Sequence, residues 1–554
     1  MDKLKPKLFS VMKHYTKEQF FKDVMSGVIV AIVALPLSIA LAIASGVSPV
    51  QGLYTAIIAG FIISFLGGSR VQIGGPTGAF MVIVFGIILE FGYVGLVKAT
   101  IMAGVILIIL GLLRLGSVIK YIPYPITMGF TSGIAVTIFT SQMQDFFGLT
   151  IINLPTDFLG KWGSYFSNIS TLNWFALAIG VFTIIVIKFM PKITPKVPGA
   201  LIAIIITSVL TIVFNIPVAT IGSKFGELSN QLPSFSFPKF TLSDIKTYME
   251  PAIIIALLGG IESLLSAVVS DGMIGSKHRS NMELIAQGTA NIASVCFGGI
   301  PATGAIARTV VNVKNGGRTP IAGITHSIVL LIILVLFMPY ASFIPLASLA
   351  GILIVVAYNM SEFKEFKLFF KSPKGDVFIL IVTFLITVLV DLVAAIEIGM
   401  VLALFLFMKR MSNMTKVQMK SLDASEDDDM SFDFEKANKK FQTDQNILIY
   451  EINGPFFFGA ADKFIDAINH IGEKNKLIIL GLKHVPFMDA TALHGFRRLI
   501  YTCQKHHIQV YVTGIQKQPY EVLMNAGVID LIGKESFYKT IEEAKICYQT
   551  NNKK

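Results

Sequence analysis

Residues 74–80 read Gly-Gly-Pro-Thr-Gly-Ala-Phe, and residues 298–306 read Gly-Gly-Ile-Pro-Ala-Thr-Gly-Ala-Ile. Both stretches contain a Gly pair, a Pro and the sequence Thr-Gly-Ala, and both lie among long apolar segments. Gly and Pro interrupt a regular helix and free backbone N–H and C=O groups. In a bilayer such groups have to be satisfied by protein, water or a ligand. We therefore interpret the two stretches, called here the first and second repeat segments, as two copies of a broken membrane helix.

The composition places the chain among membrane proteins. Of its 554 residues, 53% are hydrophobic and only 15% are charged, against roughly 25% charged residues in soluble domains. The mean hydropathy is +0.69. The net charge of +11 would suggest nucleic-acid binding in a soluble protein. In a membrane protein it indicates basic cytoplasmic loops instead, so we expect membrane lipid and no nucleic acid as a partner.

A spanning helix needs about 17–25 predominantly apolar residues. This criterion predicts fourteen spans in a polytopic α-helical protein, at residues 24–45, 50–67, 74–91, 95–113, 118–140, 172–190, 197–216, 251–270, 281–297, 302–313, 319–338, 345–358, 375–391 and 393–408. Lys and Arg are concentrated in alternate gaps between these spans, which predicts cytoplasmic N- and C-termini in a multi-pass protein of the cell membrane. The Lys-rich residues 1–23 are followed by many spans, so we do not expect a cleaved signal peptide.

Four regions follow along the chain. We predict a cytoplasmic segment at 1–23, a transport domain at 24–411, an acidic linker at 412–444 and a soluble domain at 445–554. The last region alternates strand and helix patterns, which is typical of a small α/β domain. Its predicted strands and helices lie at 446–451, 460–471, 477–482, 491–506, 509–513, 519–526 and 540–544. The three cysteines, Cys296, Cys503 and Cys547, have no metal-binding or disulfide pattern.

The repeat segments fall in the third and tenth predicted spans, so the second copy enters the membrane from the opposite side. This pattern is typical of an inverted repeat, in which paired broken helices point toward a site at the middle of the membrane. Helices beginning near Thr77 and Thr303 would present free N–H groups and positive dipole ends to an anion. The alternative is that Gly and Pro only allow a kink or close helix packing. The predicted site residues are Gly75, Pro76, Thr77, Gly78, Pro301, Ala302, Thr303 and Gly304.

Two ionisable residues within predicted spans are candidate functional residues. Glu262 stands in the middle of the eighth span, where a carboxyl group is costly and therefore requires a partner or a function. It could make a structural hydrogen bond, or it could couple transport to a proton or cation. Arg308 on the tenth span stays charged at working pH and could hold the anion, or it could snorkel to the cytoplasmic surface. A bound anion favours protonation of a nearby carboxylate, and by reciprocity a proton on Glu262 strengthens anion binding.

The chain resembles the sulfate permease (SulP) family of anion transporters. The resemblance is carried by residues 46–54, both repeat segments, residues 261–273 and residues 304–320. It implies fourteen spans in a seven-plus-seven inverted repeat within a homodimer. It further implies that a core domain of spans one to four and eight to eleven moves against a gate domain. Residues 448–458 and 485–493 resemble the STAS module of the same family. In related soluble modules a Ser follows the Asp, whereas Ala490 follows Asp489 here, so we expect dimerisation or cytoplasmic protein binding rather than phosphorylation.

The resemblance also implies site residues on the first, third, eighth and tenth spans. The matching positions are Leu37, Leu41, Thr77, Thr303, Ala307 and Arg308. Some bicarbonate-transporting members bind sodium through an Asp and a Thr on the eighth span. Glu262 and Ser266 stand at those positions here, which favours protons over sodium as the coupling ion.

The sequence thus predicts a proton-coupled carrier of sulfate, bicarbonate or a four-carbon dicarboxylate. Three alternatives stay open: a sodium-coupled bicarbonate transporter, a nucleobase:proton symporter of the same fold, and a membrane sensor whose output is the STAS domain. A nucleobase permease would tend to carry a second acidic residue on the tenth span, where Arg308 stands. No nucleophile–base pair or metal cluster suggests an enzyme, and we expect no cofactor and no bound metal.

Overall fold

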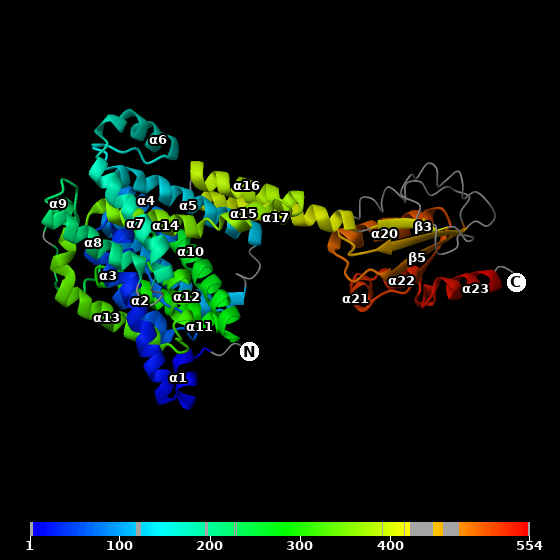
Figure 1. Ribbon diagram of the computed structural model, residues 1–554. Helices are drawn as coiled ribbons and strands as arrows, with labels where there is room; N and C mark the ends of the chain where they lie inside the picture. The colour runs from blue at the N-terminus through cyan, green and yellow to red at the C-terminus, as the bar shows by residue number, and fades with distance from the viewer. Residues whose placement is uncertain are drawn as a thin grey trace. The chain divides into compact units, whose positions relative to one another are not determined.

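The computed structural model describes residues 4–117, 123–193, 198–226, 228, 230–390, 392–414, 416–420, 447–457 and 476–551. The chain divides into two units, Met1–Val401 and Leu402–Lys554. Each unit is described by itself, and Figure 1 shows both.

The first unit is helical. Its helices, with α17 running on into the second unit, are α1 (Lys7–Val11), α2 (Lys17–Ala44), α3 (Pro49–Leu66), α4 (Gly78–Leu112), α5 (Tyr124–Phe147), α6 (Phe158–Ser167), α7 (Trp174–Ile193), α8 (Gly199–Val213), α9 (Ile221–Phe225), α10 (Leu242–Ile274), α11 (Ser280–Cys296), α12 (Ile306–Lys314), α13 (Ile321–Phe337), α14 (Leu346–Met360), α15 (Phe363–Phe369), α16 (Lys374–Leu389) and α17 (Leu392–Met414). Short 3₁₀ turns lie at Met12–His14, Ile169–Thr171 and Met338–Phe343. Each predicted apolar span overlaps one of these helices.

Seven helical stretches of the described chain are long and apolar enough to cross a membrane, which makes this a multi-pass membrane protein. They are Lys17–Ala44, Pro49–Leu66, Gly78–Leu112, Trp174–Ile193, Leu242–Ile274, Ile321–Phe343 and Leu346–Phe369. The total of fourteen spans and the seven-plus-seven repeat remain predictions.

Several predicted boundaries differ from the structure. The first helix begins at Lys17 rather than at residue 24, because Thr16 accepts a hydrogen bond from the Gln19 N–H and caps it. The third and fourth predicted spans form one helix, α4, which is interrupted at Gly92. The φ of Gly92 is 69°, a left-handed value that favours glycine. The segments at 74 and 302 begin with extended backbone rather than with helix.

The helices of the first unit pack in two groups. The core group consists of α2, α3, α4, α10, α11, α12 and α13, and the gate group consists of α5, α7, α8, α14 and α16. Within the core group, α4 packs against α10 and α11, while α13 packs against α2 and α3. Figure 1 shows the blue helices of the first half among the green helices of the second half. The core group contains the helices of the core domain that the family resemblance implies, and the gate group contains the helices of the gate domain except α17.

The second unit contains a five-stranded sheet in the order β3-β4-β5-β6-β7. Its elements are β3 (Lys416–Lys420), β4 (Ile447–Asn453), β5 (Leu477–His484), α20 (Ala490–Lys505), β6 (Gln509–Thr513), α21 (Lys517–Asn525), α22 (Val528–Ile532), a 3₁₀ turn (Lys534–Ser536), β7 (Phe537–Tyr538) and α23 (Ile541–Asn551). β3 is antiparallel to β4, and the other neighbours are parallel. The strands predicted at 446–451, 477–482 and 509–513 and the helices predicted at 491–506 and 519–526 are confirmed within a few residues. The helix predicted at 540–544 is confirmed as well, but it extends to Asn551.

The predicted linker at 412–444 is wrong for residues 416–420, because β3 lies there and pairs with β4. The helix predicted at 460–471 and linker residues 421–444 lie outside the described residues. An apolar core under the sheet includes Phe456, Phe496 and Cys503. Burial raises the pKa of the Cys503 thiol to about 12.

We expect Asp489→Ala to destabilise the α/β domain by about 1 kcal/mol, the usual loss for an N-cap. Asp489 Oδ1 accepts a hydrogen bond of 2.8 Å from the Ala492 N–H and so caps α20. The measurement is the rate at which a maleimide labels Cys503 at pH 8 in a full-length chain with Cys296→Ala and Cys547→Ser. Cys503 is protonated and buried at that pH, so it reacts only after the domain opens. Labelling should become about fivefold faster. It should not change in Asp530→Ala, which alters an exposed aspartate.

Candidate functional site

The two repeat segments meet in a short antiparallel sheet. β1 (Gly74–Gly75) pairs with β2 (Thr303–Gly304), with Gly74 opposite Gly304 and Gly75 opposite Thr303. Helix α4 begins at Gly78 and α12 begins at Ile306, directly after the two strands. The structure therefore brings together two stretches that are more than 200 positions apart in the sequence, and it starts a helix from each.

Polar side chains of neighbouring helices satisfy the backbone of the second repeat segment. The Ile300 N–H donates to Thr55 Oγ1 at 2.8 Å, and Ser294 Oγ donates to the Ile300 carbonyl at 2.7 Å. Asn291 pairs with both backbone groups of Ala302, at 2.8 and 2.9 Å. These bonds replace those that a continuous helix would make, which explains how a broken segment is tolerated inside the membrane.

The residues preceding β1 are held by side chains of α12. Asn312 Nδ2 donates to the Val71 carbonyl at 2.7 Å, and the Ile73 N–H donates to Thr309 Oγ1 at 3.1 Å. The position of the first repeat segment is thus set by the helix that follows the second.

A buried polar cluster ties the same region to α10 and α11. Gln72 Nε2 donates to Ser263 Oγ at 2.9 Å, and Ser263 Oγ donates to Glu283 Oε1 at 3.3 Å. Glu283 Oε2 also accepts hydrogen bonds from the Gly68 and Ser69 N–H groups, at 2.8 and 3.1 Å. Sequence reasoning missed this cluster, although Gln72 and Glu283 lie at the edges of apolar segments.

Both helices that start at the site lack a side-chain cap. Thr77 is the N-cap residue of α4 and Ala305 that of α12, and neither side chain accepts a hydrogen bond from the first turn of its helix. The first-turn N–H groups of a helix have no partner within the helix. Two uncapped N-termini therefore provide backbone donors and positive dipole ends at neighbouring positions, which is an arrangement suited to an anion.

Arg308 on α12 is buried, with only 2% of its surface exposed. Its Nη2 donates to Ser38 Oγ and to the Pro76 carbonyl, both at 3.2 Å. Its Nη1 is buried and has no hydrogen-bond partner. Among the described residues no carboxylate lies within ion-pair distance of Arg308. Because Arg308 is buried, it does not snorkel to the membrane surface. Its Nη1 group stays available to donate a hydrogen bond to an anion.

Glu262 on α10 contacts the start of α4. Its Oε2 accepts a hydrogen bond of 2.9 Å from Thr77 Oγ1, and its side chain is half-buried. Arg308 contacts Pro76, the residue before Thr77. The carboxyl group and the guanidinium group therefore both contact the first repeat segment.

The contacts cross between the two halves of the chain. Glu262 of the eighth predicted span contacts Thr77 of the third, and Ser38 of the first contacts Arg308 of the tenth. Such an exchange of equivalent elements is expected of an inverted repeat. Ser38 was not among the predicted site residues, whereas the family resemblance selected Leu37 and Leu41 on the same helix.

The apolar candidates on α2 lie in the core. Leu41 is buried in the main apolar cluster, and Leu37 packs against that cluster. The signal for Ser38 was a hydroxyl group two residues after Pro36, within a largely apolar span.

The remaining candidates lie close to the two strands. Thr303 Oγ1 donates to the Gly259 carbonyl at 2.9 Å, and Ser266 Oγ donates to Thr309 Oγ1 at 3.5 Å. Gly304, Pro301 and Ala302 are buried, whereas Ala307 in the first turn of α12 is exposed. A side chain on Gly304 would overlap Gln72.

Gly78 connects the site with the gate group. A Cβ atom there would lie 2.9 Å from Ile138 Cδ1 on α5 and 3.1 Å from Met360 Sδ on α14. The N-terminus of α4 thus belongs to the core group and faces the gate group.

We expect Gly75→Ala to abolish most transport while leaving the α/β domain folded. The φ of Gly75 is +155°, and a Cβ atom would overlap Arg308 Nη1. The substitution would displace the guanidinium group or separate β1 from β2. Uptake of labelled anion into proteoliposomes should fall by at least about tenfold, since one displaced ion contact is worth about 1.4 kcal/mol or more. Gly272→Ala in α10 is a matched control, because open space surrounds that position. Normal uptake by Gly75→Ala would contradict the assigned geometry.

Within the described residues, no group of three or more His, Cys, Asp or Glu side chains could hold a metal ion.

Two family models match this chain. Residues 20–383 match the model of the sulfate permease family, and residues 438–544 match that of the STAS domain. The chain is 43% identical to the putative sulfate transporter YvdB of Bacillus subtilis, over 96% of this chain and 98% of that protein. It is 31% identical to the bicarbonate transporter BicA of Picosynechococcus sp., over 94% and 93%.

Two solved structures have the same fold. The overall structure of SLC26A9 superposes with a TM-score of 0.85 at 19% identity, covering 98% of this chain and 92% of that one. The transmembrane domain of a cyanobacterial BicA superposes with a TM-score of 0.63 at 30% identity, covering 69% and 98%. Since the family model covers more than half of the chain and the relatives match over nearly their full length, the chain belongs to the sulfate permease family, a family of membrane transporters rather than enzymes, and carries a STAS domain.

Proposed function

We propose that this chain is a secondary active transporter that carries a small oxyanion or carboxylate together with a proton. The observation that carries the proposal is the buried Arg308, whose Nη1 has no partner, beside two uncapped helix N-termini. A buried guanidinium group without a counter-ion is costly. A transported anion would supply that counter-ion and would accept hydrogen bonds from the guanidinium and backbone N–H groups.

The donors suit sulfate, bicarbonate or a four-carbon dicarboxylate. A guanidinium group matches the paired oxygen atoms of an oxyanion or a carboxylate. The names of the relatives support the first two substrates, since YvdB is a putative sulfate transporter and BicA is a bicarbonate transporter.

Glu262 is the proposed coupling residue. Because its carboxyl group and Arg308 contact adjacent residues of the first repeat segment, an anion held by Arg308 would lie near Glu262. A carboxylate would repel that anion, whereas a protonated carboxyl group would not. Proton binding and anion binding would then strengthen each other by the same factor.

The proposed movement is an elevator-like displacement of the core group against the gate group. Both repeat segments and the residues that hold them belong to the core group, so the site could move as one body. Gly78 faces Ile138 and Met360 of the gate group, where such sliding would take place. We further propose a homodimer in the cell membrane, with cytoplasmic termini and a cytoplasmic protein as a partner of the STAS domain.

Sodium-coupled bicarbonate transport is the second candidate, and the match to BicA over nearly its full length favours it. Ser266 Oγ donates its proton to Thr309 and keeps its lone pairs, so together with Glu262 it would offer oxygen ligands to sodium. Membership of the sulfate permease family argues against a nucleobase symporter.

The test is a panel of labelled anions, comprising sulfate, bicarbonate and succinate, taken up by purified full-length protein in proteoliposomes. Each anion is offered with an acidic exterior, with an inward sodium gradient and with neither. Proton symport predicts that an acidic exterior stimulates the uptake of at least one anion and that sodium has no effect. Stimulation by sodium alone would favour the second candidate. Absence of uptake for all anions under all conditions would contradict anion transport.

A further inference from the structure

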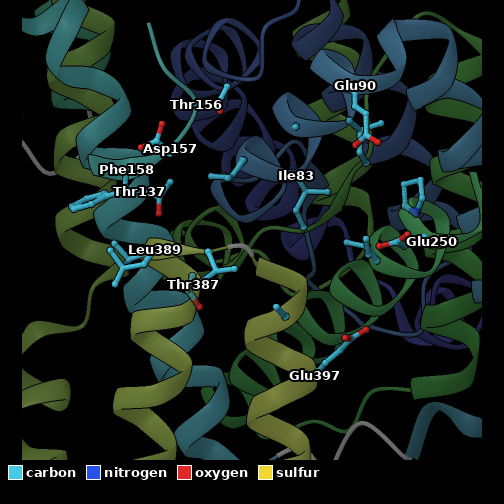
Figure 2. Close-up of a pocket in the computed structure, with 18 of the residues that line it drawn as sticks. Ile83, Glu90, Thr137, Thr156, Asp157, Phe158, Glu250, Thr387, Leu389 and Glu397 are labelled. Carbon is cyan, nitrogen blue, oxygen red and sulfur yellow. The ribbon is translucent and has the colours of Figure 1, made fainter. Parts of the chain in front are cut away.

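A cavity of about 540 Å³ lies between the core and gate groups, at some distance from the paired strands. Helices α4, α5, α10, α16 and α17 and the start of α6 line it. Figure 2 shows Ile83 of α4 within this cavity. Because a helix rises about 1.5 Å per residue, Ile83 lies about 9 Å along α4 from Thr77. The cavity is therefore within reach of the candidate site.

Lys161 of α6 lines this cavity, although only 9% of its surface is exposed. Its Nζ lies 5.9 Å from the centre of the Phe85 ring on α4. In the described part of the chain Lys161 forms neither a side-chain hydrogen bond nor an ion pair. Burial lowers the pKa of Lys161, and the charge of Asp157 only partly opposes this effect. The ammonium group of Lys161 is thus a buried cation, and the charge of Asp157 does not compensate for the cost of burying it.

The position of Lys161 is fixed by the docking of α6. Asp157 Oδ2 accepts a hydrogen bond of 2.7 Å from the Gly160 N–H and caps the helix. One turn after Lys161, Tyr165 donates its hydroxyl group to the Thr140 carbonyl of α5 at 3.0 Å. The ammonium group is therefore held on the wall of the cavity that α5 and α6 form.

Thr140 supplies a second donor on the same wall. It lines the cavity and is 1% exposed, yet its Oγ1 has no hydrogen-bond partner. The other threonines of α5, namely Thr127, Thr131 and Thr137, donate to a carbonyl three or four residues earlier. Thr140 is thus the one threonine of α5 whose hydroxyl group does not bond to the helix backbone. A buried hydroxyl group without a protein partner is expected to bind a ligand or water.

The carboxylates of the cavity come mainly from other elements. Glu90, Glu250 and Glu397 belong to α4, α10 and α17 and are exposed. In Figure 2, Glu90 and Glu250 lie across the cavity from Thr137 and Phe158. Solvent and salt screen the charges of exposed carboxylates. The buried donors of the α5–α6 wall, Lys161 and Thr140, are therefore not neutralised by these carboxylates.

We propose that Lys161 and Thr140 form an outer binding site for a small oxyanion of the sulfate or bicarbonate class. The ammonium group supplies the charge, and the hydroxyl group donates a hydrogen bond. The site holds the anion between the surrounding water and the N-terminus of α4. The role of this outer site in transport rests on the proposed function. Anion binding at the outer site does not, because the outer site shares no residue with the inner site at Arg308.

Binding is measured by the fluorescence of Trp162, which is next to Lys161 in the sequence. The chain contains two Trp residues, so Trp174→Phe leaves Trp162 as the only reporter. Sulfate, and separately bicarbonate, replaces gluconate at constant ionic strength and pH in full-length detergent-solubilised protein. We expect a saturable change that Lys161→Gln abolishes, Thr140→Val weakens several-fold and Lys161→Arg retains. The exposed-lysine control Lys364→Gln and the inner-site variant Arg308→Gln should keep it.

Transport gives an independent readout. Lys161→Gln should raise the KM for anion uptake about fivefold and leave the maximal rate within about twofold, as expected for the loss of one partly solvated charge contact. A Lys161-dependent titration supports the outer site, and so does the rise in KM where the wild-type protein gives no titration. A titration that persists in Lys161→Gln, or no titration together with an unchanged KM, would overturn it. If wild-type protein transports neither anion but the titration depends on Lys161, the proposed function fails and the outer site stands.

Discussion

Arg308→Gln should reduce anion affinity by about 30- to 1000-fold. The guanidinium group is buried, holds Ser38 and Pro76, and keeps Nη1 without a partner. Removing one member of a buried charge pair costs about 2–4 kcal/mol, and each 1.4 kcal/mol corresponds to a factor of ten. The measurement is the concentration dependence of uptake into proteoliposomes, for whichever labelled anion the wild-type protein carries.

Arg308→Lys tests the geometry separately from the charge. A lysine keeps the positive charge but cannot donate to Ser38 Oγ, the Pro76 carbonyl and an anion with the fixed fork of a guanidinium group. We expect an intermediate affinity, closer to that of the glutamine variant. The exposed Arg410 of α17 provides a matched control, since Arg410→Gln removes the same charge from an exposed side chain. A normal KM in Arg308→Gln would show that the anion binds elsewhere.

Glu262→Gln should remove the dependence of uptake on a proton gradient. Glutamine resembles the protonated carboxyl group, and its side-chain oxygen can still accept the hydrogen bond from Thr77. Coupling between two sites usually amounts to about 1–3 kcal/mol, or about 5- to 150-fold in affinity. Uptake by the variant should therefore be similar with an acidic and with a neutral exterior, whereas the wild-type protein should respond.

The control for this prediction is the exposed Glu365 of α15. Glu365→Gln removes one carboxylate and should leave the response to the proton gradient intact. Thr77→Val removes the hydroxyl donor to Glu262, so it should change the pH at which uptake is half-maximal without abolishing the response. A full response to the proton gradient in Glu262→Gln would exclude Glu262 as the coupling residue.

Much of the site could be predicted because its signals are local. Gly and Pro inside an apolar run indicate a broken helix, and two matching copies indicate a repeat. An arginine and a glutamate within predicted spans stood out because such residues are costly there. The structure places Thr77, Glu262 and Arg308 around one segment, and their roles in binding and coupling stay predictions.

The missed residues gave weaker signals. Ser38, Thr140 and Lys161 are ordinary residue types, and their importance depends on what surrounds them. A serine in a helix usually bonds to its own backbone. Only the position of α2 beside α12 shows that Ser38 instead accepts a hydrogen bond from Arg308. Leu37 and Leu41 were selected by family resemblance, and the structure places them against the apolar core.

Composition and periodicity by themselves determined that this chain crosses a membrane through many apolar helices and ends in a small α/β domain. Those properties follow from transfer free energies and local backbone preferences, which act over a few turns of helix. The pairing of β1 with β2, the burial of Arg308 and the contact of Thr77 with Glu262 were decided by the tertiary structure. Each of these three features joins residues about 185 or more positions apart in the sequence, or depends on such contacts. They form only after helices from both halves of the chain have packed together.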